Sequence, residues 1–133
     1  VHPYNDPRVI AGQGTCSREL MEQVEGLDAV IAPIGGGGMI SGTCLTLSNI
    51  APQTKIYAAE PEQADDAYQS FKQGHIIAYD APDTVADGLK VPLKERTWHF
   101  VSRFVTDVLT ASEQEIVDAM RLTWARLKIV MEP

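Results

Sequence analysis

Residues 28–50 read Asp28-Ala-Val-Ile-Ala-Pro-Ile-Gly-Gly-Gly-Gly-Met-Ile-Ser-Gly-Thr-Cys-Leu-Thr-Leu-Ser-Asn-Ile50, and this stretch decides the fold. Its apolar run, residues 28–34, does not alternate with polar residues, which is typical of a strand buried on both faces of a parallel sheet. The glycines at 35–38 separate it from a predicted helix over residues 39–50, and the next strand is predicted over residues 55–60. Strand, glycine loop, helix and strand form a βαβ unit with a right-handed crossover.

The residues before this unit predict a helix. Asp6 followed by Pro7 is typical of a helix start, and we expect the helix to run to about residue 24 and to end at Gly26. Gly12 and Gly14 lie inside it, where each glycine destabilises the helix by about 1 kcal/mol relative to alanine. Both therefore indicate a close approach of another backbone or of a ligand.

The residues after the unit continue the alternation of helices and strands. We expect a helix over residues 65–73, mostly loop over 75–92, a helix over 97–104 and a strand over 107–110. Ser112 opens a capping box, and the helix after it should reach about residue 131. We expect Trp98 of the preceding helix and Trp124 of this last helix to lie in the core. Its apolar stripe comprises Ile116, Met120, Trp124, Leu127 and Val130. The chain thus predicts a single α/β domain over residues 1–133, with an open, mostly parallel sheet and helices on both faces.

Composition excludes several classes of function. The 133 residues carry 11 Lys and Arg against 18 Asp and Glu, a net charge of −7, whereas nucleic-acid binders present basic surfaces. Pro33, the glycines and Pro52 interrupt the longest apolar stretch, so no membrane span is expected. Cys16 and Cys44 match no metal-binding spacing and no secretory signal opens the chain, so we expect two reduced thiols and a cytoplasmic protein.

The glycine loop is the strongest candidate site. It follows a buried strand and precedes a helix, where free backbone N–H groups and the helix dipole favour an anion such as phosphate. The dinucleotide fingerprint is absent because Ser41 occupies its last glycine position, and Thr43 stands where a Walker loop requires lysine. The alternative is a tight turn without a ligand, for which one or two glycines would serve. We favour anion binding.

An acidic cluster follows the second predicted strand: Glu60, Glu62, Asp65 and Asp66. Carboxylates in a strand-end loop are hard oxygen ligands suited to Mg²⁺ or Ca²⁺. Alternatively, the aspartates favour a helix N-terminus while the glutamates lie in water, and spacing alone favours this second interpretation. His2, His75 and His99 show no metal spacing, and no nucleophile motif is present, so the chain offers no catalytic residue of its own.

Several motifs in order resemble a known family. They are residues 2–15 (His-Pro-Tyr-Asn-Asp-Pro-Arg-Val-Ile-Ala-Gly-Gln-Gly-Thr), Pro33-Ile-Gly-Gly-Gly-Gly-Met39, Ala59-Glu60-Pro61, Thr84-Val-Ala-Asp-Gly88 and Met131-Glu132-Pro133. Together they resemble the serine and threonine dehydratases and serine racemases, which are pyridoxal-phosphate (PLP) enzymes of fold type II, similar to the β subunit of tryptophan synthase. The resemblance covers essentially the whole chain.

The resemblance implies roles for particular residues. Gly88 would approach the pyridoxal ring, Glu132 would lie near it, and Tyr4 stands where some racemases have Asn and many dehydratases an aromatic residue. The cofactor phosphate would be held by the amides of Gly35, Gly36, Gly37, Gly38 and Met39. A divalent cation, Mg²⁺ or Ca²⁺, would be held by Glu60, Asp66 and the carbonyl of Ala64, which reverses the preference stated for the acidic cluster.

Other family motifs are absent from these residues. They are the Ser-Phe-Lys-x-Arg-Gly type motif of the Schiff-base lysine, the Ser-x-Gly-Asn-His substrate loop and the late Ser-Gly-Gly-Asn segment. PLP chemistry needs that lysine. We therefore expect the C-terminal part of the large domain of a PLP enzyme, inactive alone and lacking the small domain. A non-catalytic phosphate- or PLP-binding module, or a fragment without a function of its own, are the alternatives.

The intact parent would act on a small amino acid such as serine, threonine or a hydroxyaspartate. It would remove the Cα proton and then either eliminate hydroxide, giving a 2-oxo acid and ammonia, or reprotonate the other face, giving the D-amino acid. The resemblance implies a homodimer or homotetramer, and leaves the choice between dehydratase and racemase open.

Overall fold

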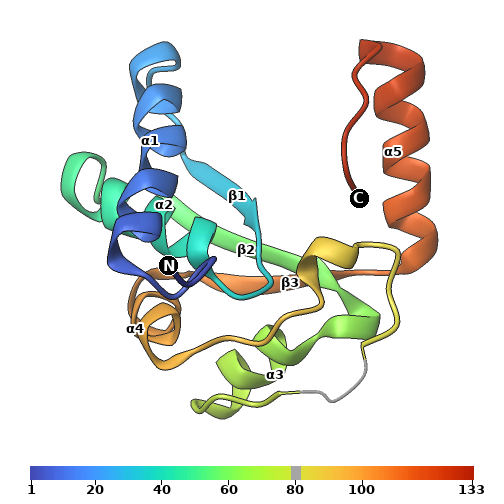
Figure 1. The fold of residues 1–133 in the computed structure, drawn as a ribbon. Helices are drawn as coiled ribbons and strands as arrows, with labels where there is room; N and C mark the ends of the chain where they lie inside the picture. Colours follow the sequence, from blue (N-terminus) through green and yellow to red (C-terminus); the bar gives the residue numbers. More distant parts are fainter. Residues whose placement is uncertain (79–81) are drawn as a thin grey trace.

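The computed structural model describes residues 1–78 and 82–133 and contains a parallel three-stranded sheet in the order β1-β2-β3 (Figure 1). The strands are β1 (Ala29–Pro33), β2 (Lys55–Pro61) and β3 (Asp107–Ala111). Ala32 pairs with Ala58, which in turn pairs with Val108. The predicted α/β fold with an open parallel sheet is confirmed.

The helices begin and end close to the predicted residues. They are α1 (Pro7–Gln23), α2 (Gly38–Ile50), α3 (Asp66–Gln73), α4 (Glu95–Phe104) and α5 (Glu113–Leu127), with 3-10 turns at Glu62–Ala64 and Asp87–Leu89. The Asp6 side chain accepts a hydrogen bond from the Arg8 amide at 2.9 Å and caps α1, and Ser112 forms the predicted capping box. The predicted loop over residues 75–92 holds the second of those turns and lies partly outside the described residues.

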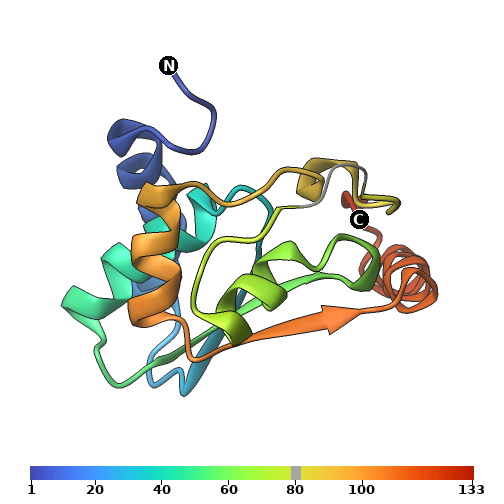
Figure 2. The same ribbon diagram turned by 90° about the horizontal axis from the view of Figure 1, so that it is seen from below.

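The described helices that pack on the sheet leave one of its faces open, as Figure 2 shows. The buried core joins Ala58 and Val108 of the sheet to Ile40 and Leu47 of α2 and Val101 of α4. On the opposite face Ile31 is 62% exposed and Leu109 is 42% exposed. The prediction that the first strand is buried on both faces is therefore wrong for the described chain, since β1 is an edge strand covered on one side.

Gly12 and Gly14 of α1 differ in how closely other atoms approach them. A Cβ on Gly42 of α2 would lie 2.5 Å from the Gly14 nitrogen and 2.6 Å from the Ile10 oxygen, so the two helix backbones touch. The predicted close approach is confirmed at Gly14. It is wrong at Gly12, which is exposed and has nothing within 4 Å of a Cβ position.

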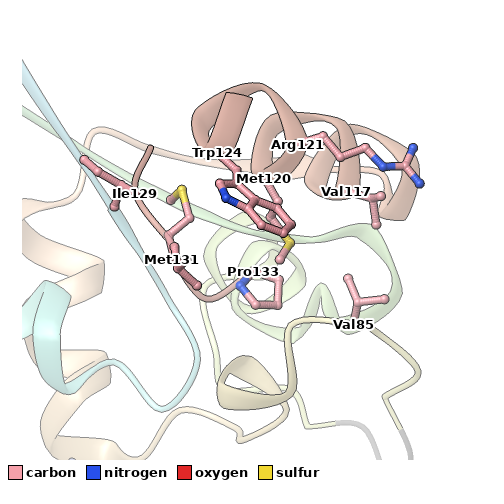
Figure 3. Close-up of a pocket in the computed structure, with 9 residues that line it drawn as sticks. Val85, Val117, Met120, Arg121, Trp124, Ile129, Met131 and Pro133 are labelled. Carbon is pink, nitrogen blue, oxygen red and sulfur yellow. The ribbon is translucent and has the colours of Figure 1, made fainter. Parts of the chain in front are cut away.

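The last helix departs most from the sequence prediction. It ends at Leu127 because Lys128 adopts a left-handed conformation (φ 60°), so Val130 lies outside it. None of its residues is buried and Trp124 is 65% exposed, so the prediction of a core Trp124 is wrong, whereas Trp98 packs against the core. The helix stands beyond the sheet with the C-terminal segment beside it (Figure 1). This segment, α5 and Val85 line an open apolar cavity of about 410 Å³ (Figure 3).

Two further observations bear on the class of protein. None of the described helices has the length and apolar character that crossing a bilayer requires. Cys16 is exposed and Cys44 is buried, and both are free thiols.

The contact between α1 and α2 predicts opposite effects for two glycine substitutions. We expect Gly42→Ala to lower the free energy of unfolding by about 2 to 3 kcal/mol, because a Cβ there overlaps the α1 backbone. Gly12→Ala should raise it by about 0.5 to 1 kcal/mol, because that site is open and helical. Thermal unfolding of the full-length protein measures both, and equal effects would contradict the close packing.

Candidate functional site

The glycine loop lies at the carboxyl end of β1 and opens onto a cavity of about 520 Å³. Ligands of open parallel sheets bind at this end of the strands. The cavity is lined by the four loop glycines with Pro33 and Met39 on either side of the loop, and by residues from three other segments: the N-terminal residues Pro3 and Tyr4, Val9 and Gln13 of α1, and Asp87, Gly88, Leu89 and Val91. Segments far apart in the sequence thus meet around the loop.

Every position in the glycine loop is packed too closely for a side chain. A Cβ on Gly35 would lie 2.9 Å from the Leu89 Cα, and one on Gly36 would lie 2.5 Å from the Tyr4 ring. Gly37 has a left-handed φ of 84° and would contact Leu93 and Thr97 at 2.8 Å, while Gly38 would contact the Tyr4 Cβ at 2.8 Å. Packing inside the protein therefore accounts for all four glycines, and their number alone does not indicate a ligand.

The backbone amides are the feature that favours an anion. No side chain caps α2 at Gly37, and the first hydrogen bond of the helix runs from the Ser41 amide to the Gly37 carbonyl at 3.0 Å. The N–H groups of Gly38 and Met39 precede that bond, so they have no partner within the helix. Together with the positive end of the helix dipole, they form a site suited to a phosphate group.

The two residues expected near a cofactor ring line two neighbouring cavities. Gly88 lines the same cavity as the glycine loop, and nothing lies within 4 Å of its Cβ position, so the space above it is open. Glu132 lines a neighbouring cavity of about 320 Å³ that shares Pro33 and Leu89 with the first. The described structure thus brings Gly88 to the loop and Glu132 to the adjoining space.

Two acidic residues form a buried pair close to this end of the sheet. Glu60, at the end of β2, is 3% exposed and accepts hydrogen bonds from the amides of Ala67 and Tyr68. Burial, with Asp66 and Asp65 adding negative charge, raises the pKa of Glu60 to about 8. Burial likewise raises the pKa of Asp66 to about 6, and the Asp66 Oδ2 atom is buried without a hydrogen-bond partner.

These surroundings favour a cation. Ala64, which is 1% exposed, ends the turn before α3. The buried carboxyl groups of Glu60 and Asp66, with the unpartnered Asp66 Oδ2 atom, form no ion pair among the described residues. A divalent ion with oxygen ligands would supply a positive charge there. The alternative, in which both glutamates lie in water, is wrong for Glu60 and holds for the exposed Glu62. The described residues contain no group of three or more His, Cys, Asp or Glu side chains placed for a metal ion.

Comparison with known proteins gives the family. The description of that family is pyridoxal-phosphate dependent enzyme, and the match extends over residues 1–133. The chain belongs to this family. The family resemblance stated from the sequence motifs is therefore confirmed.

The relatives are dehydratases and racemases. The chain is 75% identical over 133 residues to the beta-hydroxyaspartate dehydratase of Paracoccus denitrificans, covering 42% of that protein, and 48% identical to the serine racemase of Arabidopsis thaliana, covering 40%. All of the chain aligns in both cases. Maize serine racemase has the same fold, with a TM-score of 0.98 and 46% identity, and this chain spans 40% of it. The chain thus spans less than half the length of these relatives.

Sequence reasoning missed the residues that pack on the glycine loop. Leu93 and Thr97 contact Gly37, and the Leu93 amide faces Asp66 and lowers its pKa, opposing the effect of burial. Leu89 contacts Gly35. Nothing in the local sequence indicated these contacts, because they join residues far apart in the chain, more than fifty positions in the case of the glycine loop.

The buried carboxyl pair predicts a pH dependence. With the pKa of Glu60 raised from 4.5 to about 8, the folded protein retains a proton that the unfolded chain releases. Stability should therefore fall as the pH rises from about 5 to 8, by on the order of a few kcal/mol in the absence of divalent cations. Glu60→Gln should flatten this slope and Glu62→Gln should leave it unchanged. Thermal unfolding with excess chelator measures it, and parallel slopes in wild type and Glu60→Gln would contradict the assignment.

Proposed function

We propose that this chain is the phosphate-binding part of a PLP-dependent dehydratase or racemase. The observation that carries the proposal is the uncapped N-terminus of α2, which opens onto the cavity bordered by Gly88. Family membership supplies the cofactor, pyridoxal 5′-phosphate. The amides of Gly35, Gly36, Gly37, Gly38 and Met39 would hold its phosphate, with Gly88 and Glu132 beside its ring.

The cofactor would supply the reactive group, and this chain would bind and position it. Bound PLP supplies an electron sink that stabilises negative charge on the substrate Cα atom. The residues of this chain would hold the phosphate in place and border the open space over Gly88, where the ring would lie. The described lining of the cavity contains no lysine, so we place the proton-transferring lysine in a part of the protein outside this chain. The chain alone is then inactive.

The exposed apolar surface supports a place within a larger domain. Ile31 and Leu109 on the open face of the sheet are exposed, as are Trp124 and Leu127 of α5. Large contiguous apolar patches are rare on monomeric soluble proteins, so exposed apolar side chains on both a sheet face and a helix favour a covering partner. We propose that residues 1–133 form the C-terminal part of a large domain whose other segments cover this face, and that the small domain lies outside the chain.

The substrate of the intact enzyme is proposed from its relatives. The high identity to a beta-hydroxyaspartate dehydratase favours a β-hydroxy amino acid, with hydroxyaspartate as the first to test and serine and threonine next. The enzyme would release a 2-oxo acid and ammonia, or form the D-amino acid, in the cytoplasm as a homodimer or homotetramer. The full-length protein incubated with each amino acid should release ammonia or change optical rotation. PLP binding without turnover of any of them would favour a non-catalytic PLP-binding module.

We further propose a divalent cation at Glu60, Asp66 and the Ala64 carbonyl. It would neutralise two buried carboxylates and occupy the unpartnered Asp66 oxygen. The cation would fix the end of β2 relative to α3, next to the cofactor cavity.

The phosphate assignment predicts the effect of removing one amide. Met39→Pro deletes an N–H group in the first turn of α2, where proline is tolerated, and Met39→Leu keeps it. Because hydrogen bonds to charged groups contribute about 1.5 to 3 kcal/mol, we expect Met39→Pro to weaken PLP binding by about tenfold to a hundredfold. Fluorescence titration of the full-length apoprotein measures the affinity. Unchanged binding in Met39→Pro, with Met39→Leu as the control, would refute the assignment.

The cation assignment predicts a selective loss of stabilisation. Millimolar Ca²⁺ or Mg²⁺ should raise the melting temperature of the full-length protein at pH 8, because it neutralises carboxylates that burial destabilises. Glu60→Gln and Asp66→Asn should each abolish that rise, while Glu62→Gln retains it. A rise that persists in both variants would place the cation elsewhere.

A further inference from the structure

Tyr4 closes the glycine loop against the segment that carries Gly88. Its ring lies on the loop, since a Cβ on Gly36 would approach its ring carbons to 2.5 Å and one on Gly38 would approach its Cβ to 2.8 Å. Its hydroxyl donates a hydrogen bond to the Pro92 carbonyl at 3.0 Å, in a partly buried position. One side chain thus contacts two of the segments that line the cavity.

The far side of the loop is held by the residue next to Pro92. The Leu93 side chain is buried and would lie 2.8 Å from a Cβ on Gly37. The glycine loop is therefore packed between the Tyr4 ring and the Leu93 side chain. The hydrogen bond from the Tyr4 hydroxyl to the Pro92 carbonyl links the two sides. The same segment continues back to Leu89, which contacts Gly35, and to Gly88.

Neighbouring residues in the sequence hold Tyr4 in place. The His2 ring meets the Tyr4 ring edge-on at 4.6 Å, and the His2 Nδ1 atom accepts a hydrogen bond from the Asn5 amide at 3.0 Å. Asp6 then caps α1, whose backbone touches α2 at Gly14 and Gly42. The position of the tyrosine relative to the N-terminus of α2 is therefore set by helix packing.

From this geometry we propose that Tyr4 is a positioning residue that fixes the spacing between the phosphate-binding amides and Gly88. The inference rests on the proposed function, in which these two elements bind the two ends of one cofactor. Without the hydroxyl, the segment from Leu89 to Pro92 keeps the contacts of Leu89 and Leu93 with the glycine loop but loses its hydrogen bond to the tyrosine that packs on the loop. The amides would then still receive the phosphate, while the ring end of the cofactor would be less well placed.

The test compares Tyr4→Phe, which keeps the ring and removes the hydroxyl, with wild-type full-length protein. A neutral hydrogen bond of this kind corresponds to a change in affinity of about threefold to tenfold. We expect PLP binding to weaken by that factor and the visible circular dichroism of the bound cofactor to change. The phosphorus resonance of the bound phosphate should stay in place. Tyr57→Phe, at a half-buried tyrosine of β2 outside the cavity, is the control and should match wild type.

The outcomes separate the inference from the proposed function. Wild-type affinity and circular dichroism in Tyr4→Phe would overturn the positioning role while leaving the cofactor site intact. A lower melting temperature of the Tyr4→Phe apoprotein, with unchanged affinity and circular dichroism, would also overturn it, because Tyr4 would then be structural only. Failure of the wild-type protein to bind PLP would overturn the proposed function and this inference with it.

Discussion

The contact between the backbones of α1 and α2 is the constraint on which the candidate site depends. Gly14 and Gly42 leave no side chain between the two helices, so α1 lies directly on α2. That packing places the residues just before α1, including Tyr4, against the N-terminus of α2. The glycine loop is then enclosed by protein on several sides while the amides of its first helical turn still reach a cavity. The backbone contact at Gly14, next to the cavity-lining residue Gln13, thus shapes the cavity.

The site combines two kinds of unsatisfied group at the carboxyl ends of neighbouring strands. After β1 the N–H groups at the start of α2 lack acceptors, and after β2 the buried carboxyl groups of Glu60 and Asp66 lack a cation. Parallel pairing of the strands brings these ends to the same edge of the sheet. Both sets of groups would be stabilised by a partner of opposite charge, an anion at the N-terminus of α2 and a cation at the carboxyl groups, which is what we propose.

The sequence predicted much of the fold because the decisive signals are local. Asp6 with Pro7, the Ser112 capping box and the apolar run before the glycines all act within a few residues, and the elements that they mark begin at or next to the predicted residues. Errors arose where burial depends on distant partners. Trp124 and Ile31 have the large apolar side chains typical of a core, yet no described segment covers them. The contacts of Tyr4 and Leu93 with the glycine loop were missed for the same reason. The four glycines were interpreted as a ligand signal, and packing alone now accounts for them.

The central claim is that the N-terminus of α2 binds the phosphate of pyridoxal phosphate. The most direct measurement is a crystal structure of the full-length protein grown with the cofactor. We predict density for the phosphate within hydrogen-bond distance of the amides of residues 35–39, with the pyridine ring beside Gly88. A phosphate bound at any other element, with the glycine loop facing solvent or protein only, would contradict the account.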